Sequence, residues 1–288
     1  MNFEILNNVS LKDFCTFRIG GEAKFLYFAY SNIQLIDVCL YCKSHNIKYK
    51  VIGLGANLLF DDLGFDGMII INKTNEILFE ENAVLVDGGV NVTTLIMKCY
   101  LRSLCGFENL VGIPSTVGGA VVNSLGAFNT NIGDFVEYVE CYHKKDLTKK
   151  LTLNHEECKF GYRTSLFKKN EYIITKVKLK LKHDNKKLIK ERIDKAIEKK
   201  RDTQPLNQHS AGSVFKRGNI IPAKVIDELG LKGTKIGGAE VSTKHAGFIV
   251  NSHSATSKEV KQLIAFIQNK VKTTYNEDLE PEIEFVEY

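Results

Sequence analysis

The sequence lacks any apolar stretch long enough to cross a lipid bilayer. No apolar run in its 288 residues approaches the roughly 20 residues that a spanning helix requires. The opening decapeptide, MNFEILNNVS, has neither the basic start nor the apolar run of a secretory signal. We therefore expect a cytoplasmic protein that is neither secreted nor inserted into a membrane.

The sequence also lacks a strong charge excess and a regular cysteine pattern. The 39 basic and 34 acidic residues leave a net charge of +5, which is too small to indicate nucleic acid as a partner. Seven cysteines without regular spacing are typical of reduced thiols. The Cys39/Cys42 pair has no second pair and no histidine beside it, so no metal site is expected. No feature indicates an obligate protein partner.

The most informative segment is GIPSTVGGA, residues 112–120. Three glycines and a proline in nine positions exclude an ordinary helix or strand. Glycine is required where the backbone turns through positive φ or where a ligand touches the main chain. Together with the hydroxyls of Ser115 and Thr116, such a loop can surround a phosphate. The alternative is a tight structural loop between buried strands.

Two further glycine segments lie upstream. Gly53-Leu-Gly-Ala-Asn57 interrupts two apolar runs, but it lacks the third glycine and the long helix of a Rossmann fingerprint. A weaker element places Arg18 just before Gly20 and Gly21. These segments together suggest one extended ligand with a central pyrophosphate, held mainly by backbone.

Hydrophobic periodicity and capping residues predict helices and strands along the whole chain. The expected helices cover residues 31–45, 92–101, 186–201, 222–230 and 256–271. Lysines at 176, 178, 180 and 182 alternate with apolar residues, which predicts a strand with one solvated face. A last strand is expected over residues 279–286.

Three polar side chains stand in contexts that suit chemistry. Arg163, between aromatic residues and hydroxyls, could bind a carboxylate bidentately, or it could simply stack on a surface tyrosine. Small neighbours leave the Ser213 hydroxyl accessible, but no nucleophile elbow surrounds it, and a structural turn is the alternative. Glu282 could act as a general acid or base, or it could be a charge at the start of a strand.

Taken together, the motifs resemble those of the UDP-N-acetylenolpyruvoylglucosamine reductase family, in its type II branch, which lacks an inserted fold. The resemblance covers nearly the whole chain and follows the family's motif order: FRIGG (17–21), GLGANLL (53–59), GIPSTVGGA (112–120), FGYRTSLFK (160–168), TQPLNQHSAGSVFK (203–216), LKGTKIGGAEVSTKHAGFIVN (231–251) and LEPEIEF (279–285). It implies a flavoenzyme of peptidoglycan precursor synthesis. FAD would be its cofactor, with NADPH and UDP-N-acetylglucosamine enolpyruvate as substrates.

The resemblance implies an α+β fold, with a bipartite FAD-binding domain of the vanillyl-alcohol-oxidase type and a C-terminal α+β substrate domain. The FAD-binding subdomains would span residues 1–72 and 73–183, and the substrate domain residues 184–275. The final strand, about 276–288, would return to the first subdomain.

The resemblance also assigns roles to individual residues. Hydride would pass from flavin N5 to the vinyl carbon, with Ser213 as the proton donor and Arg163 and Glu282 stabilising an enediolate-like intermediate. The expected FAD contacts are Arg18, Gly53, Gly55, Ala56, Asn57, Leu58, Gly112, Ile113, Pro114, Ser115, Thr116, Gly118, Gly119 and Ala120. The expected contacts to the UDP diphosphate are Lys200, Arg201, Lys216 and Arg217. The chain departs from the family pattern at Ala56, Ser115, Ser124, Leu125, Arg217 and Glu240.

Two other functions share part of these features. A related flavin oxidase would use the same FAD loops and reduce dioxygen, without requiring Arg163, Ser213 and Glu282 together. A non-catalytic nucleotide-sugar binding protein would have no redox role and no flavin spectrum.

Overall fold

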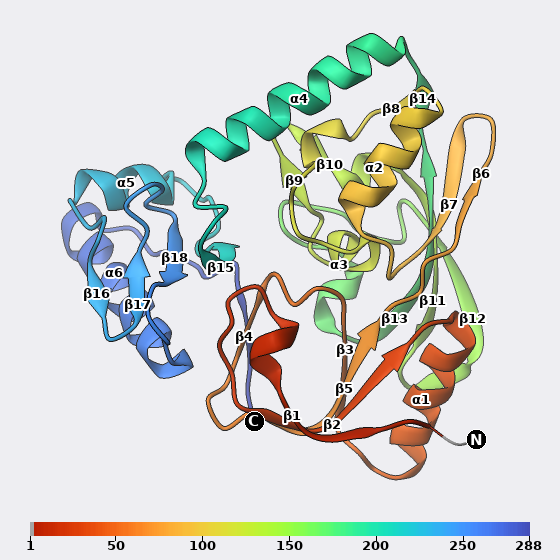
Figure 1. The fold of residues 1–288 in the computed structure, drawn as a ribbon, viewed down its shortest axis with the longest axis horizontal. Helices are drawn as coiled ribbons and strands as arrows, with labels where there is room; N and C mark the ends of the chain where they lie inside the picture. Colours follow the sequence, from red (N-terminus) through yellow and green to blue (C-terminus); the bar gives the residue numbers. More distant parts are fainter. Residues whose placement is uncertain (1–2) are drawn as a thin grey trace. The chain divides into compact units, whose positions relative to one another are not determined.

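We analysed a computed structural model that describes residues 3–288 (Figure 1). The chain folds into two units, each built from separate stretches of sequence. Unit 1 contains residues 3–4, 27–53 and 69–199, and unit 2 contains residues 5–26, 54–68 and 200–288. The division falls within strands β2 (Glu22–Ala29) and β5 (Phe65–Asn72), which belong with β1 (Leu6–Ser10) and β3 (Tyr49–Ile52) to a sheet of order β1-β2-β5-β3.

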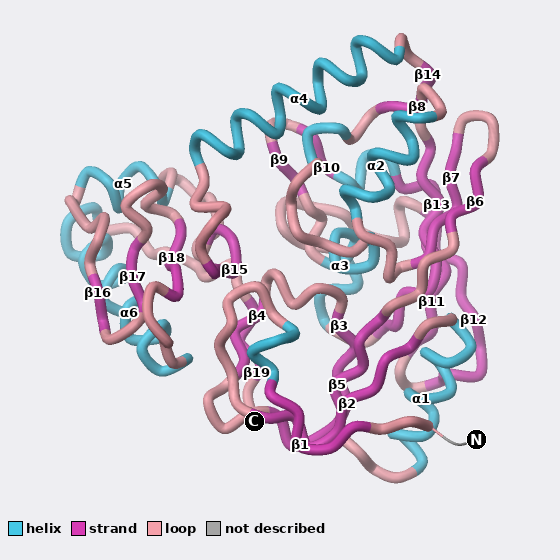
Figure 2. The backbone as a smooth tube through the Cα atoms, in the orientation of Figure 1, coloured by secondary structure: helices cyan, strands magenta, loops and turns pink. Residues whose placement is uncertain are grey.

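A five-stranded antiparallel sheet forms the centre of unit 1. Its order is β12-β11-β13-β7-β6, and the neighbouring strands can be followed in Figure 2. Alternate residues of β7, β11 and β13, among them Val86, Val139 and Val177, are buried in its core. The strands are β6 (Ile77–Phe79), β7 (Ala83–Asp87), β11 (Val136–His143), β12 (Asp146–Asn154) and β13 (Tyr172–Lys180).

Short elements surround this sheet. Helices α1 (Asn32–Ser44) and α2 (Val92–Leu101) begin at caps whose side chains accept a backbone N–H, Ser31 and Asn91. The remaining elements of unit 1 are β8 (Leu104–Cys105), the 3-10 helix η2 (Glu108–Leu110), α3 (Val117–Val122), β9 (Gly126–Ala127), β10 (Thr130–Asn131), η3 (Ile132–Phe135), η4 (Leu166–Lys169) and β14 (Lys182–His183).

Helix α4 (Lys186–Thr203) belongs to unit 1 over most of its length. Ile189 and Ile193, one turn apart, are buried in the unit 1 core. Arg192 bonds the buried carboxylate of Glu108 at 2.9 Å and pairs with Asp184 at 2.8 Å. The boundary between the two units therefore falls after Lys199, whereas the change to a lysine-rich helical segment in the sequence predicts a domain boundary near residue 184. The three-domain division stays a prediction.

Unit 2 contains a four-stranded sheet of order β15-β18-β17-β16. It is accompanied by helix α6, whose apolar stripe includes Leu263, Ile267 and Val271. Its elements are η1 (Leu11–Phe14), β4 (Leu58–Phe60), β15 (His209–Ser213), α5 (Pro222–Glu228), β16 (Lys235–Ile236), β17 (Ala239–Val241), β18 (Phe248–Asn251), α6 (Ser257–Tyr275) and β19 (Glu284–Val286).

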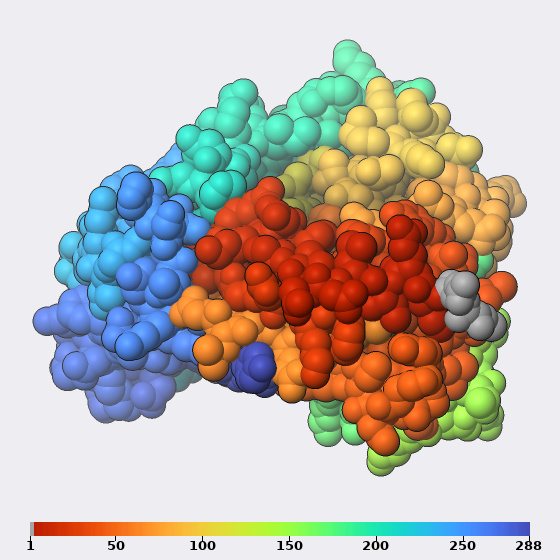
Figure 3. Space-filling model, turned by 60° about the horizontal axis from the view of Figure 1, so that its bottom comes forward, coloured from red at the N-terminus to blue at the C-terminus, as the bar shows by residue number. Residues whose placement is uncertain are grey.

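The last strand of the chain pairs with an early one. β19 lies parallel to β4, with Glu284 opposite Leu58 and Val286 opposite Phe60. Lys261 of α6 bonds both Asp61 and Glu287 at 3.1 Å, which fastens the end of this pair. Figure 3 shows the C-terminal end, in dark blue, at the surface beside the orange segment near residue 60.

The predicted helices are confirmed, whereas two strand predictions need correction. The last strand covers only 284–286, so Glu282 precedes it; the bridge between Phe215 and Pro281 is isolated. The face of β13 predicted to be solvated is closed at Lys178, which is 7% exposed and forms an ion pair with Glu80. Among the described residues, no helix is long and apolar enough to span a bilayer.

Candidate active site

The glycine segment 112–120 forms a loop that runs into the short helix α3. Thr116 is the N-cap of α3, and its Oγ1 accepts the N–H of Gly119 at 3.2 Å. Gly112 lies at φ +78°, in the left-handed region that favours glycine, and a Cβ there would meet nothing within 4 Å. The loop therefore combines an anchored end at Thr116 with open space at Gly112.

Most backbone donors of this loop are bonded within unit 1. Val117 donates to the carbonyl of Val90, and Gly118 to that of Gly88, both at 2.8 Å. Gly112 donates to Thr93 Oγ1 at 2.8 Å. Because these N–H groups are engaged, a ligand at the loop would contact small residues and close main chain rather than a row of free donors. This differs from the phosphate cradle that the sequence suggests.

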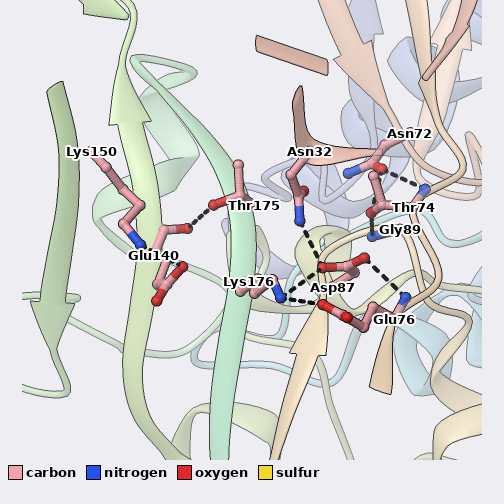
Figure 4. A network of polar contacts seen from close by, with 10 residues as sticks. All are labelled: Asn32, Asn72, Thr74, Glu76, Asp87, Gly89, Glu140, Lys150, Thr175 and Lys176. Carbon is pink, nitrogen blue, oxygen red and sulfur yellow. Dashed lines mark hydrogen bonds and ion pairs between the residues drawn. The ribbon is translucent and has the colours of Figure 1, made fainter. Parts of the chain in front are cut away.

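A polar network around Asp87 fixes the turn at Gly88 and Gly89, to which the loop is hydrogen-bonded (Figure 4). Asp87, 4% exposed at the end of β7, accepts from Asn32 Nδ2 at 2.7 Å and from the N–H of Glu76 at 2.9 Å. Lys176 adds a cation 3.9 Å from the Asp87 carboxylate. Just beyond Asp87, Gly89 donates to Thr74 Oγ1 at 3.1 Å. The network fixes the turn whose carbonyl at Gly88 accepts from Gly118.

Gly53, at the end of β3, lies against the anchored end of the loop. A Cβ at Gly53 would lie 2.3 Å from Thr116 Oγ1 and 2.7 Å from its Cγ2. Only glycine allows this approach without a shift of Thr116. The structure thus brings together two of the glycine segments that the sequence singled out separately.

The rest of the second glycine segment, 54–58, belongs to unit 2. Gly55 lies at φ +62°, and a Cβ there would be 2.2 Å from the carbonyl oxygen of Phe14. Asn57 bonds the C-terminal segment twice: its Nδ2 donates to the carbonyl of Glu282 at 3.2 Å, and its own carbonyl accepts from Glu284 at 2.9 Å. A predicted cofactor residue is therefore a direct neighbour of the predicted acid.

Ser213 and Glu282 lie on adjacent segments of unit 2. The N–H of Glu282 donates to the carbonyl of Val214 at 2.7 Å, and Lys216 donates to Glu280 at 2.9 Å. Ser213 ends β15, opposite Phe248 of β18. The backbone thus places the half-buried residue Ser213 beside the segment that carries Glu282.

Arg163 occupies a turn of unit 1. Gly161 and Thr164 exchange backbone hydrogen bonds of 3.0 and 3.3 Å, which leaves Tyr162 and Arg163 at the tip. The guanidinium carbon of Arg163 lies 5.6 Å from the centre of the Tyr162 ring. A Cβ at Gly126, in β9, would lie 3.4 Å from Arg163 Nη1. Arg163 therefore faces the hairpin that follows α3.

The basic residues predicted to contact FAD or the UDP diphosphate differ in their exposure and in their ion pairs. Arg18 pairs with exposed Asp13 at 2.7 Å, Lys216 pairs with Glu280, and Arg217 is exposed. Arg201 pairs with Asp202 at 3.4 Å. Lys200 is 2% exposed, and burial lowers the pKa of its ammonium to about 8.

The structure shows how the chain accommodates two of the residues that depart from the family pattern. Ser115 fits the loop with its Oγ donating to the carbonyl of Thr116 at 3.0 Å. Ser124 lies at φ +45°, fully buried, and its Oγ donates to Asn131 Oδ1 at 3.0 Å. At a third departure, Glu240 forms an ion pair with Lys235 at 3.2 Å, and no structural consequence is evident for Ala56 or Arg217.

Sequence reasoning missed three residues that hold the Arg163 turn. Ser165 Oγ donates to the carbonyl of Val122 at 2.8 Å, and Lys168 Nζ donates to Asn123 Oδ1. The motif around Arg163 contains both Ser165 and Lys168, but only the fold brings them to the end of α3.

Among the described residues, no cluster of histidine, cysteine, aspartate and glutamate could hold a metal ion.

Comparison with known proteins defines the class first. The model of the FAD binding domain matches residues 23–146, and the model of the "UDP-N-acetylenolpyruvoylglucosamine reductase, C-terminal domain" matches residues 204–286. The molecule is thus an α+β flavoprotein with an FAD-binding part followed by a reductase C-terminal domain, which confirms the predicted fold class.

Full-length relatives give the family. UDP-N-acetylenolpyruvoylglucosamine reductase of Thermotoga maritima is 39% identical over 270 residues, covering 93% of each chain. The Clostridium kluyveri protein of the same name is 36% identical and covers 96% of this chain and 91% of its own. The crystal structure of the reductase from Thermus caldophilus superposes with a TM-score of 0.83 at 32% identity, covering 99% of both chains. The chain belongs to the UDP-N-acetylenolpyruvoylglucosamine reductase family.

Proposed function

We propose that the protein reduces UDP-N-acetylglucosamine enolpyruvate to UDP-N-acetylmuramate with NADPH, through bound FAD, in peptidoglycan precursor synthesis. Family membership over nearly the whole chain carries the proposal. The pairing of the Ser213 and Glu282 segments within unit 2 supports it, because the reaction needs a proton donor close to a group that stabilises charge.

The glycine segments fit FAD. Gly53 and Gly118 sit where a Cβ would lie within 3.0 Å of other atoms, so a small residue is required at each, while Gly112 borders open space. At Gly112 a large planar cofactor with a diphosphate can approach the backbone closely, whereas Gly53 and Gly118 allow segments of the chain itself to pack together. We assign FAD contacts to the residues named from the sequence, with Gly53, Thr116 and Asn57 as their structural anchors.

When bound, FAD accepts hydride from NADPH and supplies it to the vinyl carbon of the substrate. The residues of the chain then have three tasks. The Arg163 guanidinium binds the substrate carboxylate, where charge accumulates, and stabilises it more in the transition state than in the ground state. Glu282, if protonated, donates a hydrogen bond to the same developing charge. Ser213 Oγ holds the proton that is transferred to the carbon bearing the ether oxygen.

The proposal also covers the contacts to the substrate diphosphate, the compartment and the partners of the enzyme. Lys200, Arg201, Lys216 and Arg217 would contact the UDP diphosphate. The enzyme would act in the cytoplasm on small substrates, without nucleic acid or an obligate protein partner.

Anaerobic spectroscopy tests the proposal. The purified protein should be yellow, NADPH should bleach the flavin absorbance, and UDP-N-acetylglucosamine enolpyruvate should restore it promptly. Rapid peroxide formation in air, with no response to the enolpyruvyl substrate, would favour a flavin oxidase. A colourless protein that cannot be reconstituted with FAD would favour a nucleotide-sugar binding protein without redox activity.

A further inference from the structure

Asn123, the C-cap of α3, contacts two functional segments through one carboxamide. Its Nδ2 donates to the carbonyl of Gly119 at 3.3 Å, within the predicted FAD loop. Its Oδ1 accepts from Lys168 Nζ, on the 3-10 helix that follows the Arg163 turn. The carboxamide therefore forms a polar link from the glycine loop to the segment that carries Arg163.

Ser165 provides a second attachment of the same segment. Its side chain is 6% exposed, its Oγ donates to the carbonyl of Val122 at 2.8 Å, and it accepts the N–H of Phe167 at 3.3 Å. Since Gly161 and Thr164 close the turn, this attachment comes directly after it. Ser165 and Lys168 thus fasten the base of the turn to the C-terminal end of α3.

The turn needs such attachments because Arg163 has an unfavourable backbone conformation. Its φ is +55°, in the left-handed region that non-glycine residues enter at an energetic cost. Such a conformation persists only when surrounding contacts enforce it. The contacts of Ser165 and Lys168 with α3 are two side-chain attachments that adjoin the turn on its C-terminal side.

We propose that Lys168 is a positioning residue, which through Asn123 holds the Arg163 guanidinium in register with the FAD loop. Lys168 acts through Arg163 and has no assigned contact with substrate. The inference rests on the proposed function, in which Arg163 serves only the substrate half of the reaction. A displacement of about 1 Å at a catalytic group can lower a rate about 100-fold, so the expected effect is large and confined to that half.

Stopped-flow spectroscopy on the FAD-loaded enzyme tests the proposal. Lys168→Met should slow flavin reoxidation by UDP-N-acetylglucosamine enolpyruvate by about 10- to 100-fold, and flavin reduction by NADPH by less than about twofold. Lys169→Met, one residue further along η4 and exposed, is the matched control and should leave both half-reactions unchanged. Lys168→Arg keeps the donor and should recover most of the rate. Asn123→Ala removes the acceptor and should reproduce the split even if Lys168→Met fails to fold.

A double variant distinguishes positioning from general destabilisation. In the Arg163→Ala background, Lys168→Met should add less than about twofold, because the residue through which it acts is gone. An undiminished effect there would overturn the proposal, as would equal slowing of both half-reactions or a Lys168→Met variant that matches Lys169→Met. A wild-type enzyme whose reduced flavin does not respond to the substrate would instead overturn the proposed function.

Discussion

The close approach of Gly53 to Thr116 provides a sharp test of how the glycine segments are assembled. In Gly53→Ala, the new methyl group would lie 2.3 Å from Thr116 Oγ1 and 2.7 Å from its Cγ2. Thr116 cannot rotate away freely, because its Oγ1 caps α3 through the N–H of Gly119 at 3.2 Å. Either the cap breaks or the end of β3 moves.

The expected loss of stability follows from these two alternatives. Overpacking of a rigid site costs about 1–3 kcal/mol, and loss of a threonine cap costs about 1 kcal/mol. Replacing glycine by alanine returns about 0.5 kcal/mol by restricting the unfolded chain. We therefore expect Gly53→Ala to lower the free energy of unfolding by about 2–3 kcal/mol and to weaken FAD binding, because both affected segments belong to the predicted cofactor site.

Urea denaturation followed by circular dichroism, together with the flavin content of the purified protein, measures both effects. Gly218→Ala is the control, since a Cβ at Gly218 meets nothing within 4 Å. Thr116→Ala removes both clashing atoms, so the double variant should be about 1–2 kcal/mol more stable than the sum of the single effects predicts. Additive effects, or a Gly53→Ala variant as stable as Gly218→Ala, would show that the two segments are not in contact.

Three further substitutions test other parts of the molecule. Ser213→Ala should leave flavin reduction by NADPH nearly intact and slow substrate reduction at least about 100-fold, and equal loss in both half-reactions would contradict its role as proton donor. Asn57→Ala removes the 3.2 Å bond to Glu282 and should lower the free energy of unfolding by about 1 kcal/mol in urea denaturation. Lys200 has a pKa of about 8 in the folded protein against an ordinary value of 10.5, so the unfolded chain holds the proton more tightly. The wild type should therefore gain about 3 kcal/mol of stability between pH 8 and 10.5, whereas Lys200→Met should show a flatter profile in unfolding measurements across that range.

The helices could be predicted because capping residues and apolar periodicity lie within the helical segment itself. The Ser31 cap of α1 and the capping box of α6 are formed as the sequence indicates. The prediction for Lys178 failed because period-two alternation reports only which side chains share a face. Whether that face is covered depends on a distant hairpin, here the one that supplies Glu80.

The motifs predict which residues form the candidate site, but not the contacts that support them. The roles of the glycine segments, Arg163, Ser213 and Glu282 stay predictions. Which backbone donors of the 112–120 loop are engaged was not predictable, because their acceptors, such as Val90 and Gly88, lie in other segments. The hydrogen bond between Asn123 and Lys168 likewise joins residues 45 positions apart, and nothing in either local sequence indicates it.

The pairing of β19 with β4 has a consequence for biosynthesis. Leu58 leaves the ribosome early, whereas its partner Glu284 is made 226 residues later. Strand β19, and the Glu282 segment held by Asn57 and Val214, therefore cannot pair until residues 282–286 have been synthesised. Until that moment β4 has an unpaired edge, which is a site for wrong pairing or chaperone binding. A chain truncated before residue 282 would lack both β19 and the predicted acid, so the edge of β4 would stay unpaired.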